Sequence, residues 1–253
     1  MKTIILIAVR LKSSRLPEKA LKMVEDQTLV AHLIDRMKTV KNAEKIILCT
    51  STNSQDDPLV EVAKQKNIEY FRGDETNVID RFIKASEKYN PDQVIRVTGD
   101  NCLISPEFLD QAILKHIENK ADYTATTELP QGAKGEVIAF SALKKLHELV
   151  QDPHASEYMT WQLDNPSVFK VQKLHVDEKW NRPNYRVTCD TTQDLKLIKE
   201  IYKRLYKPGN IVDFNSVIKL LDNHPELVEI NKEIKQVGKV DVKDKVNYKL
   251  KGQ

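Results

Sequence analysis

Cationic and hydroxyl side chains cluster directly after the first apolar run of the chain. The run covers 3–9, and the segment behind it contains Arg10, Lys12, Ser13, Ser14, Arg15 and Lys19. In open α/β sheets, ligands bind in the crevice at the carboxyl ends of the strands. A basic loop at this place indicates a polyphosphate ligand, because clustered cations raise the local potential. The alternative is a solvated basic turn without a ligand.

Two aspartates stand where later strands are expected to end. Asp100 follows a predicted strand at 93–98, and Asp190 follows one at 185–189. Two carboxylates that converge opposite a cationic loop would hold Mg²⁺, which accepts one or two carboxylates together with phosphate oxygens. Taken singly, each could instead be a turn residue, and Asp190 could cap the helix that follows it.

A third polar turn covers 71–82. It combines a glycine, Gly73, with a candidate helix N-cap, Asn77, and the adjacent charges Asp80 and Arg81. The simplest interpretation of the two charges is an ion pair within the helix, with no part in ligand binding.

The first half of the chain alternates short β-rich runs with segments of helical period, which predicts a doubly wound, mostly parallel α/β sheet. The expected strands are 3–9, 45–50, 68–71, 93–98 and 122–126. The expected helices are 29–40, 58–66, 78–89 and 106–119, the last with Ser105 as N-cap and Pro106 in its first turn.

The pattern changes after Thr127. Strands are expected at 135–140, 169–175 and 185–189, and helices at 141–150 and 155–163. Helices dominate 191–231, with breaks at 207–210 and 224–225. We therefore expect one domain at 1–233, with a ligand-binding half at about 1–127 and a mixed and helical half at about 128–233. A Lys-rich tail follows at 234–253, where the alternation at 240–251 suits an edge strand, an extended arm or a frayed end.

Composition excludes several classes of protein. The 253 residues contain 40 Lys and Arg against 37 Asp and Glu, a net charge of +3 that does not fit a nucleic-acid binder. The three cysteines show no paired spacing, so no zinc site or disulfide framework is indicated and a cytoplasmic location is expected. The opening apolar run is too short to span a membrane and lacks a signal-peptide pattern.

The loop at 8–21 resembles the P-A-R-x-x-S-T-R-L-P-G-K-x-L signature of 3-deoxy-manno-octulosonate and acylneuraminate cytidylyltransferases. The chain is also similar to their relative, the spore-coat polysaccharide biosynthesis protein F family. That second similarity lies in the segments 56–58, 71–73, 78–82, 96–100 and 187–195. The resemblance extends from residue 1 to about 231, and five matching pieces in the same order make it specific.

The resemblance implies a fold of the nucleotide-diphospho-sugar transferase type. It also implies Mg²⁺ as cofactor, CTP as donor, and an acid sugar or similar polysaccharide precursor, or a polyol, as acceptor. By matched position, the nucleotide-binding residues would be Ala8, Arg10, Ser13, Ser14, Arg15, Lys19, Asp80 and Arg81. The catalytic residues would be Arg15, Lys19 and Asp100, and the metal ligands Asp100 and Asp190. Relatives with this fold are often dimers, so a homodimer is a further expectation.

Several residues depart from the family pattern. Glu18 stands where the signature has glycine, which adds a carboxylate beside the expected phosphates and removes a permissive backbone. We expect Glu18 to point outward and pair with Lys12 or Lys22, because an unpaired like charge beside the phosphates would be costly. Val9 stands where relatives commonly have alanine or glutamine. The acceptor half, around 129–137 and 154–158, matches only loosely, although His154 or Glu157 could orient an acceptor.

The chemistry that these groups support is nucleotidyl transfer, in which an acceptor oxygen attacks the α-phosphorus and pyrophosphate leaves. Two alternatives remain open. A sugar-nucleotide-dependent glycosyltransferase could share the sheet and a metal carboxylate, but it normally shows an Asp-x-Asp pair, which the segment 100–102 lacks. A catalytically silent nucleotide-binding protein is the other alternative, given Glu18.

Overall fold

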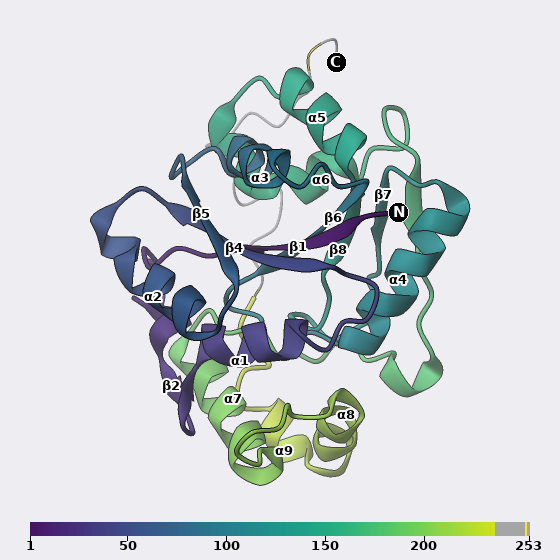
Figure 1. The fold of residues 1–253 in the computed structure, drawn as a ribbon. Helices are drawn as coiled ribbons and strands as arrows, with labels where there is room; N and C mark the ends of the chain where they lie inside the picture. Colours follow the sequence, from purple (N-terminus) through teal and green to yellow (C-terminus); the bar gives the residue numbers. More distant parts are fainter. Residues whose placement is uncertain (236–250, 252–253) are drawn as a thin grey trace.

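A seven-stranded sheet forms the centre of the computed structural model, which describes residues 1–235 and 251 (Figure 1). Its strand order is β5-β4-β1-β6-β8-β7-β9. The first four of these are parallel, with bounds β1 (Thr3–Ala8), β4 (Lys45–Ser51), β5 (Glu69–Gly73) and β6 (Gln93–Thr98). The predicted doubly wound half is thereby confirmed.

The other side of the sheet is mixed, as the change of pattern after Thr127 predicted. It consists of β7 (Tyr123–Ala125), β8 (Glu136–Ala139) and β9 (Val171–Lys173). β8 runs antiparallel to both β6 and β7, whereas β9 is parallel to β7. The antiparallel pairing of β8 with β6 therefore joins the two halves in one continuous sheet.

Helices cover both faces of the sheet (Figure 1). One face packs against α1 (Leu29–Met37), α2 (Asp57–Gln65), α4 (Pro106–Asn119), α7 (Thr192–Leu205), α8 (Phe214–Asn223) and the short α9 (Pro225–Val228). The other face packs against α3 (Val78–Glu87), α5 (Phe140–Leu149) and α6 (Met159–Leu163). Two further short strands, β2 (Met23–Val24) and β3 (Gln27–Thr28), form a hairpin before α1. Burial of apolar side chains on both faces is the main stabilising contribution.

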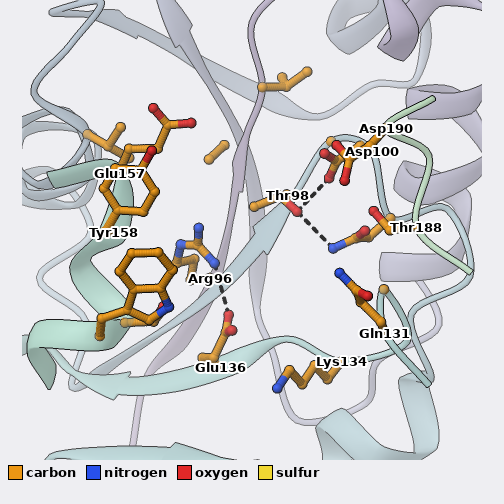
Figure 2. Close-up of a pocket in the computed structure, with 18 of the residues that line it drawn as sticks. Arg96, Thr98, Asp100, Gln131, Lys134, Glu136, Glu157, Tyr158, Thr188 and Asp190 are labelled. Atoms are coloured by element: carbon orange, nitrogen blue, oxygen red, sulfur yellow. Dashed lines mark hydrogen bonds and ion pairs between the residues drawn. The ribbon is translucent and has the colours of Figure 1, made fainter. Parts of the chain in front are cut away.

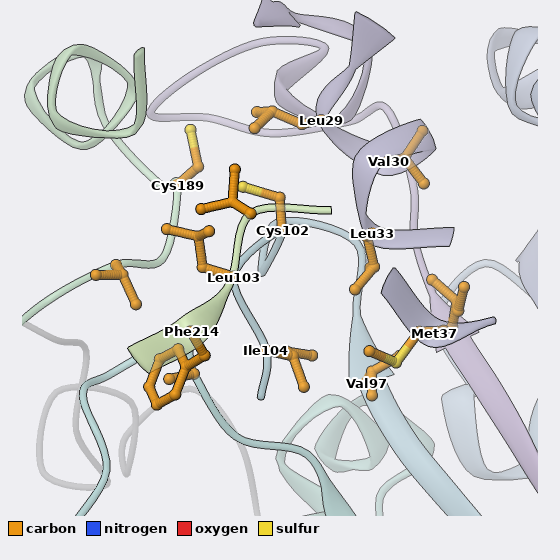
Figure 3. Packing of buried hydrophobic residues seen from close by; sticks show 14 of the residues in the cluster. Leu29, Val30, Leu33, Met37, Val97, Cys102, Leu103, Ile104, Cys189 and Phe214 are labelled. Atoms are coloured by element: carbon orange, nitrogen blue, oxygen red, sulfur yellow. The ribbon is translucent and has the colours of Figure 1, made fainter. Parts of the chain in front are cut away.

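The larger core cluster lies directly behind the carboxyl end of β6. Figure 3 shows Leu33 and Met37 of α1 near Val97 of β6, with Cys102 and Cys189 in the same cluster. All three cysteines are free and buried. The loop after β6 is thus fixed to the core, because its side chains Cys102, Leu103 and Ile104 are buried in this cluster.

Local helix signals are mostly confirmed. The Ser105 hydroxyl accepts from the Phe108 N–H at the start of α4, and the Asn77 side chain accepts from the Asp80 N–H at the start of α3. The suggestion that Asp190 caps the next helix is wrong, because Thr191 is the N-cap and forms a capping box with Asp194.

The strand predicted at 185–189 is also wrong. This segment makes only an isolated parallel bridge, between Gln131 and Arg186. Its N–H groups are divided between two loops, since Val187 donates to the Gln131 carbonyl at 2.7 Å and Cys189 donates to the Asp100 carbonyl at 3.0 Å. The β-rich composition of 185–189 therefore predicted an extended backbone correctly. It could not show that this segment bonds to two loops and does not pair with a strand of the sheet.

The predicted tail at 234–253 lies mostly outside the described residues, which include only 234, 235 and 251 of it. Within the part of the chain that is described, no helix has both the length and the apolar character needed to cross a bilayer.

A close backbone approach at Gly132 gives the first test. Its φ is +92°, and a Cβ there would lie 2.4 Å from the Thr188 backbone nitrogen. Gly132→Ala should lower the free energy of unfolding by about 2–4 kcal/mol, from left-handed strain together with overpacking. Urea denaturation with circular dichroism measures this.

Gly209→Ala is the matched control. Gly209 has φ +81°, but a Cβ there would meet nothing within 4 Å. It should cost only the backbone strain, about 1–2 kcal/mol. Equal losses in the two variants would show that the loop at 131–133 does not need its close approach to Thr188.

Candidate active site

A large cavity opens at the carboxyl ends of β1 and β6, where the strand order changes direction. The chain builds β4 and β5 to one side of β1 and then returns to place β6 on the other side. The loops that leave β1 and β6 therefore face each other across a crevice, the usual ligand site of such sheets. The cavity has a volume of about 810 Å³ and is lined by both loops.

Nine of the ten predicted site residues line this cavity: Ala8, Arg10, Ser13, Ser14, Arg15, Lys19, Arg81, Asp100 and Asp190. Figure 2 shows Asp100 and Asp190 side by side on one wall, with Glu157 and Tyr158 on the opposite wall. Residues up to 182 positions apart in the sequence therefore meet in one place, as the strand-end reasoning required.

The centre of the site is a contact of one ammonium with two carboxylates. The Lys19 Nζ lies 2.5 Å from Asp100 Oδ2 and 2.6 Å from Asp190 Oδ1. The three side chains are largely buried, with exposed fractions of 18%, 18% and 9% respectively. Charge-assisted contacts of this kind are among the strongest in proteins, so this cluster fixes three loops relative to one another.

Burial and charge act in opposite directions on these groups. Burial opposes the ammonium of Lys19, but the carboxylates of Asp100 and Asp190 raise its pKa to about 12. Burial likewise opposes ionisation of Asp100, but Lys19 and the Thr98 hydroxyl lower its pKa below the ordinary range. Both partners are therefore charged at neutral pH.

Besides Lys19, two arginines contact Asp190 and hold it in place. Its Oδ2 lies 3.2 Å from Arg15 Nη2 and 3.0 Å from Arg186 Nη2. Arg186 also binds the fully buried Asp194, with Nε 2.8 Å from Oδ1. The Asn231 amide donates to the Arg186 carbonyl and to Asp194 Oδ1, at 3.1 and 2.8 Å. The start of α7 and the segment after α9 thus orient one carboxylate of the site.

Asp100 is oriented from its own loop. The Thr98 hydroxyl donates to Asp100 Oδ1 at 2.7 Å, and the Asn101 amide donates to the Thr98 hydroxyl oxygen at 2.8 Å (Figure 2). Gly99 between them has no room for a side chain, since a Cβ would lie 2.4 Å from Val9 Cγ2. The loops after β1 and β6 are therefore in direct contact at their first residues.

Two arginines bring the third predicted turn to the cavity. Arg10 Nη1 donates to the Glu75 carbonyl at 2.7 Å, and Arg81 Nη1 donates to the Asp74 carbonyl at 2.8 Å. Arg10 also lies 3.6 Å from Glu157 Oε2, on the far wall. Arg81 is buried, which lowers its pKa from the usual arginine value, and its Nε has no hydrogen-bond partner among the described residues.

Asp80 is the predicted site residue that the structure does not bring to the cavity. Its carboxylate lies 2.9 Å from Lys84 Nζ, one helical turn later, and 3.9 Å from His147 of α5. The suggested pairing of Asp80 with Arg81 is wrong as well, because adjacent residues of a helix point in different directions. The helical period separates Arg81, which faces the cavity, from Asp80, which faces α5.

The sequence indicated the second half of the cavity only loosely, as the segments 129–137 and 154–158, and it suggested roles there for His154 and Glu157 alone. This half contains Arg96, Tyr123, Lys134, Glu136, Tyr158, Trp161, Asp164 and Lys173. Of the two residues suggested there, Glu157 lines the cavity, whereas the cavity lining does not include His154. A signal was present in the sequence, because Arg96 interrupts the apolar residues of a predicted central strand. A charged side chain at a buried position is rare unless it has a partner or a ligand.

The pair Asp100 and Asp190 passes a chemical test as ligands of a divalent cation. Both carboxylates approach one position from different loops, and a cation, the Lys19 ammonium, already lies between them. Among the described residues, no cluster of three or more His, Cys, Asp and Glu side chains forms a complete cage. Two carboxylates beside an open polar cavity are nevertheless the donor set that Mg²⁺ uses when substrate phosphates supply further oxygens.

Glu18 occupies a backbone conformation that favours glycine. Its φ is +52°, in the left-handed region, at the position where the family signature has glycine. The side chain is exposed and does not line the cavity, so it points outward as expected. The expected pairing with Lys12 is not formed, since Lys12 binds Glu75 at 3.1 Å. No ion pair of Glu18 is present among the described residues.

Comparison with known proteins agrees with this geometry. The family model of cytidylyltransferases matches residues 4–230. The spore coat polysaccharide biosynthesis protein SpsF of Bacillus subtilis is 31% identical over 227 residues, which cover 87% of this chain and 94% of SpsF.

Two solved structures share the fold. A cytidylyltransferase from Leptospira borgpetersenii serovar Hardjo-bovis matches with a TM-score of 0.84 and 26% identity, over 94% of this chain and 100% of the other. A CMP:2-keto-3-deoxy-manno-octonic acid synthetase complexed with CTP matches with a TM-score of 0.63 and 15% identity, over 81% of this chain and 99% of the other. The predicted fold class is confirmed.

The strain at Glu18 can be measured. Glu18→Gly should raise the free energy of unfolding by about 0.5–1 kcal/mol, because glycine adopts this φ without steric cost. Glu25→Gly is the matched control, since Glu25 has the same φ of 52° in the β2–β3 turn and lies outside the cavity. Urea denaturation should show a similar gain in both variants.

The same variant tests the direction of the Glu18 side chain. If the carboxylate points outward, the KM for CTP should change less than about threefold, the size of a surface electrostatic effect. A tenfold or larger decrease in KM would show instead that Glu18 opposes the phosphates.

Proposed function

The chain belongs to the cytidylyltransferase family, and from this premise we propose that it transfers CMP from CTP to a small acid sugar or related polysaccharide precursor. An acceptor oxygen attacks the α-phosphorus, the bond from that phosphorus to the bridging oxygen breaks, and pyrophosphate leaves. The observation that supports this proposal is that Lys19 of the basic loop contacts both Asp100 and Asp190. A phosphate-binding loop and a carboxylate pair are both needed at the reacting phosphorus.

The loop after β1 supplies the grip on the triphosphate. Arg10, Arg15 and Lys19 line the cavity, and Ser13 and Ser14 add hydroxyl donors. Arginine binds phosphate with two parallel hydrogen bonds, whereas lysine acts as a mobile point charge. Arg15 and Lys19 are the groups that we assign to the leaving pyrophosphate, because charge develops there as the bond breaks.

Asp100 and Asp190 are the residues that we assign to a divalent cation, with Mg²⁺ as the natural ion. When bound, the ion would supply positive charge at the phosphate oxygens. The Lys19 ammonium contacts both carboxylates, so it would be released toward the triphosphate when another cation takes its place between them. Arg186 and Asn231 would keep Asp190 oriented throughout, because their contacts do not involve Lys19.

The geometry fits nucleotidyl transfer better than glycosyl transfer. A glycosyltransferase of this architecture would be expected to place a second acidic residue two positions after Asp100, but the residue there is the buried Cys102. It would also have little use for a pyrophosphate grip in the first loop. We place the reaction in the cytoplasm, where the three unpaired thiols stay reduced. A homodimer stays a prediction.

Release of pyrophosphate from CTP, measured over a panel of sugar acids and phosphorylated polyols, tests the proposal. Asp100→Asn and Asp190→Asn should lower turnover on the order of a hundredfold or more, because the bound cation contributes several kcal/mol to catalysis. Calorimetric titration with Mn²⁺ in the presence of CTP should show weaker metal binding in both variants.

Asp80→Asn is the matched control, since this carboxylate binds Lys84 and lies outside the cavity. It should leave turnover within about twofold of the parent. Near-normal turnover of Asp100→Asn or Asp190→Asn would remove that residue from the site, and CTP binding without any turnover across the panel would favour the silent nucleotide-binding protein.

The phosphate grip makes a separate prediction. Arg15→Ala and Lys19→Ala should weaken binding of CTP far more than binding of CMP, because the lost contacts are to the leaving pyrophosphate. Each charge-assisted contact is worth roughly 1.5–3 kcal/mol, or about tenfold to a hundredfold in Kd. Isothermal titration with both nucleotides measures the difference.

Arg72→Ala serves as the control, because Arg72 binds Asp57 outside the cavity. Its affinities for both nucleotides should be unchanged. An equal loss of CTP and CMP affinity in Arg15→Ala would mean that the loop contacts the nucleoside or the α-phosphate instead.

A further inference from the structure

A buried ion pair lies on the floor of the second half of the cavity. Arg96 of β6 and Glu136 of β8 are register partners, so their side chains share one face of the sheet. Nη1 of Arg96 lies 3.2 Å from Oε2 of Glu136 (Figure 2). The side chains are only 16% and 12% exposed, yet both line the cavity.

This pair leaves hydrogen-bonding capacity unused. The guanidinium of Arg96 has several N–H donors, but its one recorded bond is that from Nη1 to Glu136, and Nε has no partner among the described residues. Glu136 retains lone pairs beyond the one that Arg96 uses. An unmet buried donor is costly, so a purely structural pair would be expected to satisfy it within the protein.

An aromatic wall stands beside the ion pair. The rings of Tyr158 and Trp161 are stacked, with centroids 4.6 Å apart and planes inclined by 19°. Both residues line the cavity, and Figure 2 shows Tyr158 on the side of Arg96 and away from Asp100 and Asp190. A stacked pair of rings is a stiff, flat and apolar surface with few freely rotating bonds.

The charges around this floor are not fully balanced. Lys173 is paired with Asp164 at 2.6 Å. Lys134 instead donates to the Thr126 carbonyl at 2.6 Å and has no acidic partner among the described residues. Glu157 also lines this half but lies 3.6 Å from Arg10, so within the described part of the chain Lys134 is left as a cation without a carboxylate partner. This suits an acceptor that carries a negative group.

We propose that Arg96 and Glu136 determine acceptor specificity by binding neighbouring polar substituents of a cyclic sugar, whose apolar ring face packs against Tyr158 and Trp161. The inference rests on the proposed function and narrows its acceptor from a sugar or polyol to a sugar in ring form. A donor and an acceptor side by side match adjacent substituents of a rigid ring. An acyclic polyol has no fixed apolar face and loses more conformational freedom when it is ordered.

A binding experiment tests the ring without relying on turnover. The fluorescence of the protein is titrated with 3-deoxy-manno-octulosonate and N-acetylneuraminate as ring sugars, and with ribitol 5-phosphate and glycerol 3-phosphate as acyclic probes. At least one ring sugar should change the emission with a Kd below about 10 mM, and Trp161→Phe should abolish that change. The second tryptophan, Trp180, is buried outside the cavity and is retained in both proteins.

The outcomes separate this inference from the proposed function. Ring-sugar binding without pyrophosphate release would support the inference and contradict the function. Pyrophosphate release with an acyclic phosphate, or a stronger response of Trp161 to an acyclic probe than to every ring sugar, would overturn the inference and leave the function standing. Absence of any response to ring sugars would also overturn it.

Variants of the ion pair test its specific role. Arg96→Lys and Glu136→Gln should raise the KM for the ring-sugar acceptor about tenfold to a hundredfold, while the KM for CTP stays within about twofold. Asp35→Asn is the matched control, because it breaks a half-buried ion pair with Lys66 that lies outside the cavity. It should change neither KM.

A charge swap separates recognition from stability. The double variant Arg96→Glu with Glu136→Arg keeps an ion pair, so its melting temperature should return to within about 3 °C of the parent even if the single variants are unstable. Its acceptor KM should stay raised at least tenfold, because the donor and acceptor have exchanged places. Recovery of acceptor KM together with stability would show that the pair is only structural and would overturn the inference.

Discussion

The site depends on one electrostatic constraint: two largely buried carboxylates, Asp100 and Asp190, must share a cation. Lys19 meets this requirement in the free protein, and it does so from a loop more than eighty residues away from either partner. Without Lys19, Asp190 would still contact Arg15 and Arg186, but Asp100 would keep only its hydrogen bond from Thr98. The penalty for an uncompensated buried charge is about 3–5 kcal/mol. The three loops are therefore held together before any ligand arrives.

This constraint would also couple the binding of a nucleotide to the binding of a divalent cation. If Lys19 contacts the triphosphate as proposed, its ammonium would leave Asp100 and Asp190, and another cation would have to replace it between these carboxylates. Nucleotide and divalent cation should then bind with positive coupling, because each removes the obstacle that the other meets. Asp190 would keep its orientation during this exchange, since Arg186 contacts it directly and Asn231 in turn donates to the Arg186 carbonyl. The buried network around Asp194 thus supports function through rigidity and adds no chemistry of its own.

The sequence predicted what is determined locally. Ser105 and Asn77 cap their helices, and the basic loop lies at a strand end, because capping residues and strand-to-loop changes act over a few positions. Two of the misses came from nonlocal facts. The segment 185–189 is extended without a ladder of its own, and Arg96 meets Glu136 only because β8 reverses beside β6. The suggested pairing of Asp80 with Arg81 was a local error, because adjacent residues of a helix point in different directions. Register between strands distant in sequence cannot be read from either strand alone.

Two departures from the family pattern, Val9 and Glu18, are each accommodated by the local structure around them. Val9 fills the space beside Gly99, where a Cβ would lie 2.4 Å from Cγ2, so the larger side chain is accommodated by a glycine on the facing loop. Glu18 takes up a left-handed backbone conformation and sends its carboxylate to solvent, so its cost falls on stability and not on the phosphates. Arg15 and Lys19 line the cavity in the presence of both substitutions. A signature glycine can therefore be lost without loss of the site wherever the backbone keeps its φ and the new side chain points away from the cavity.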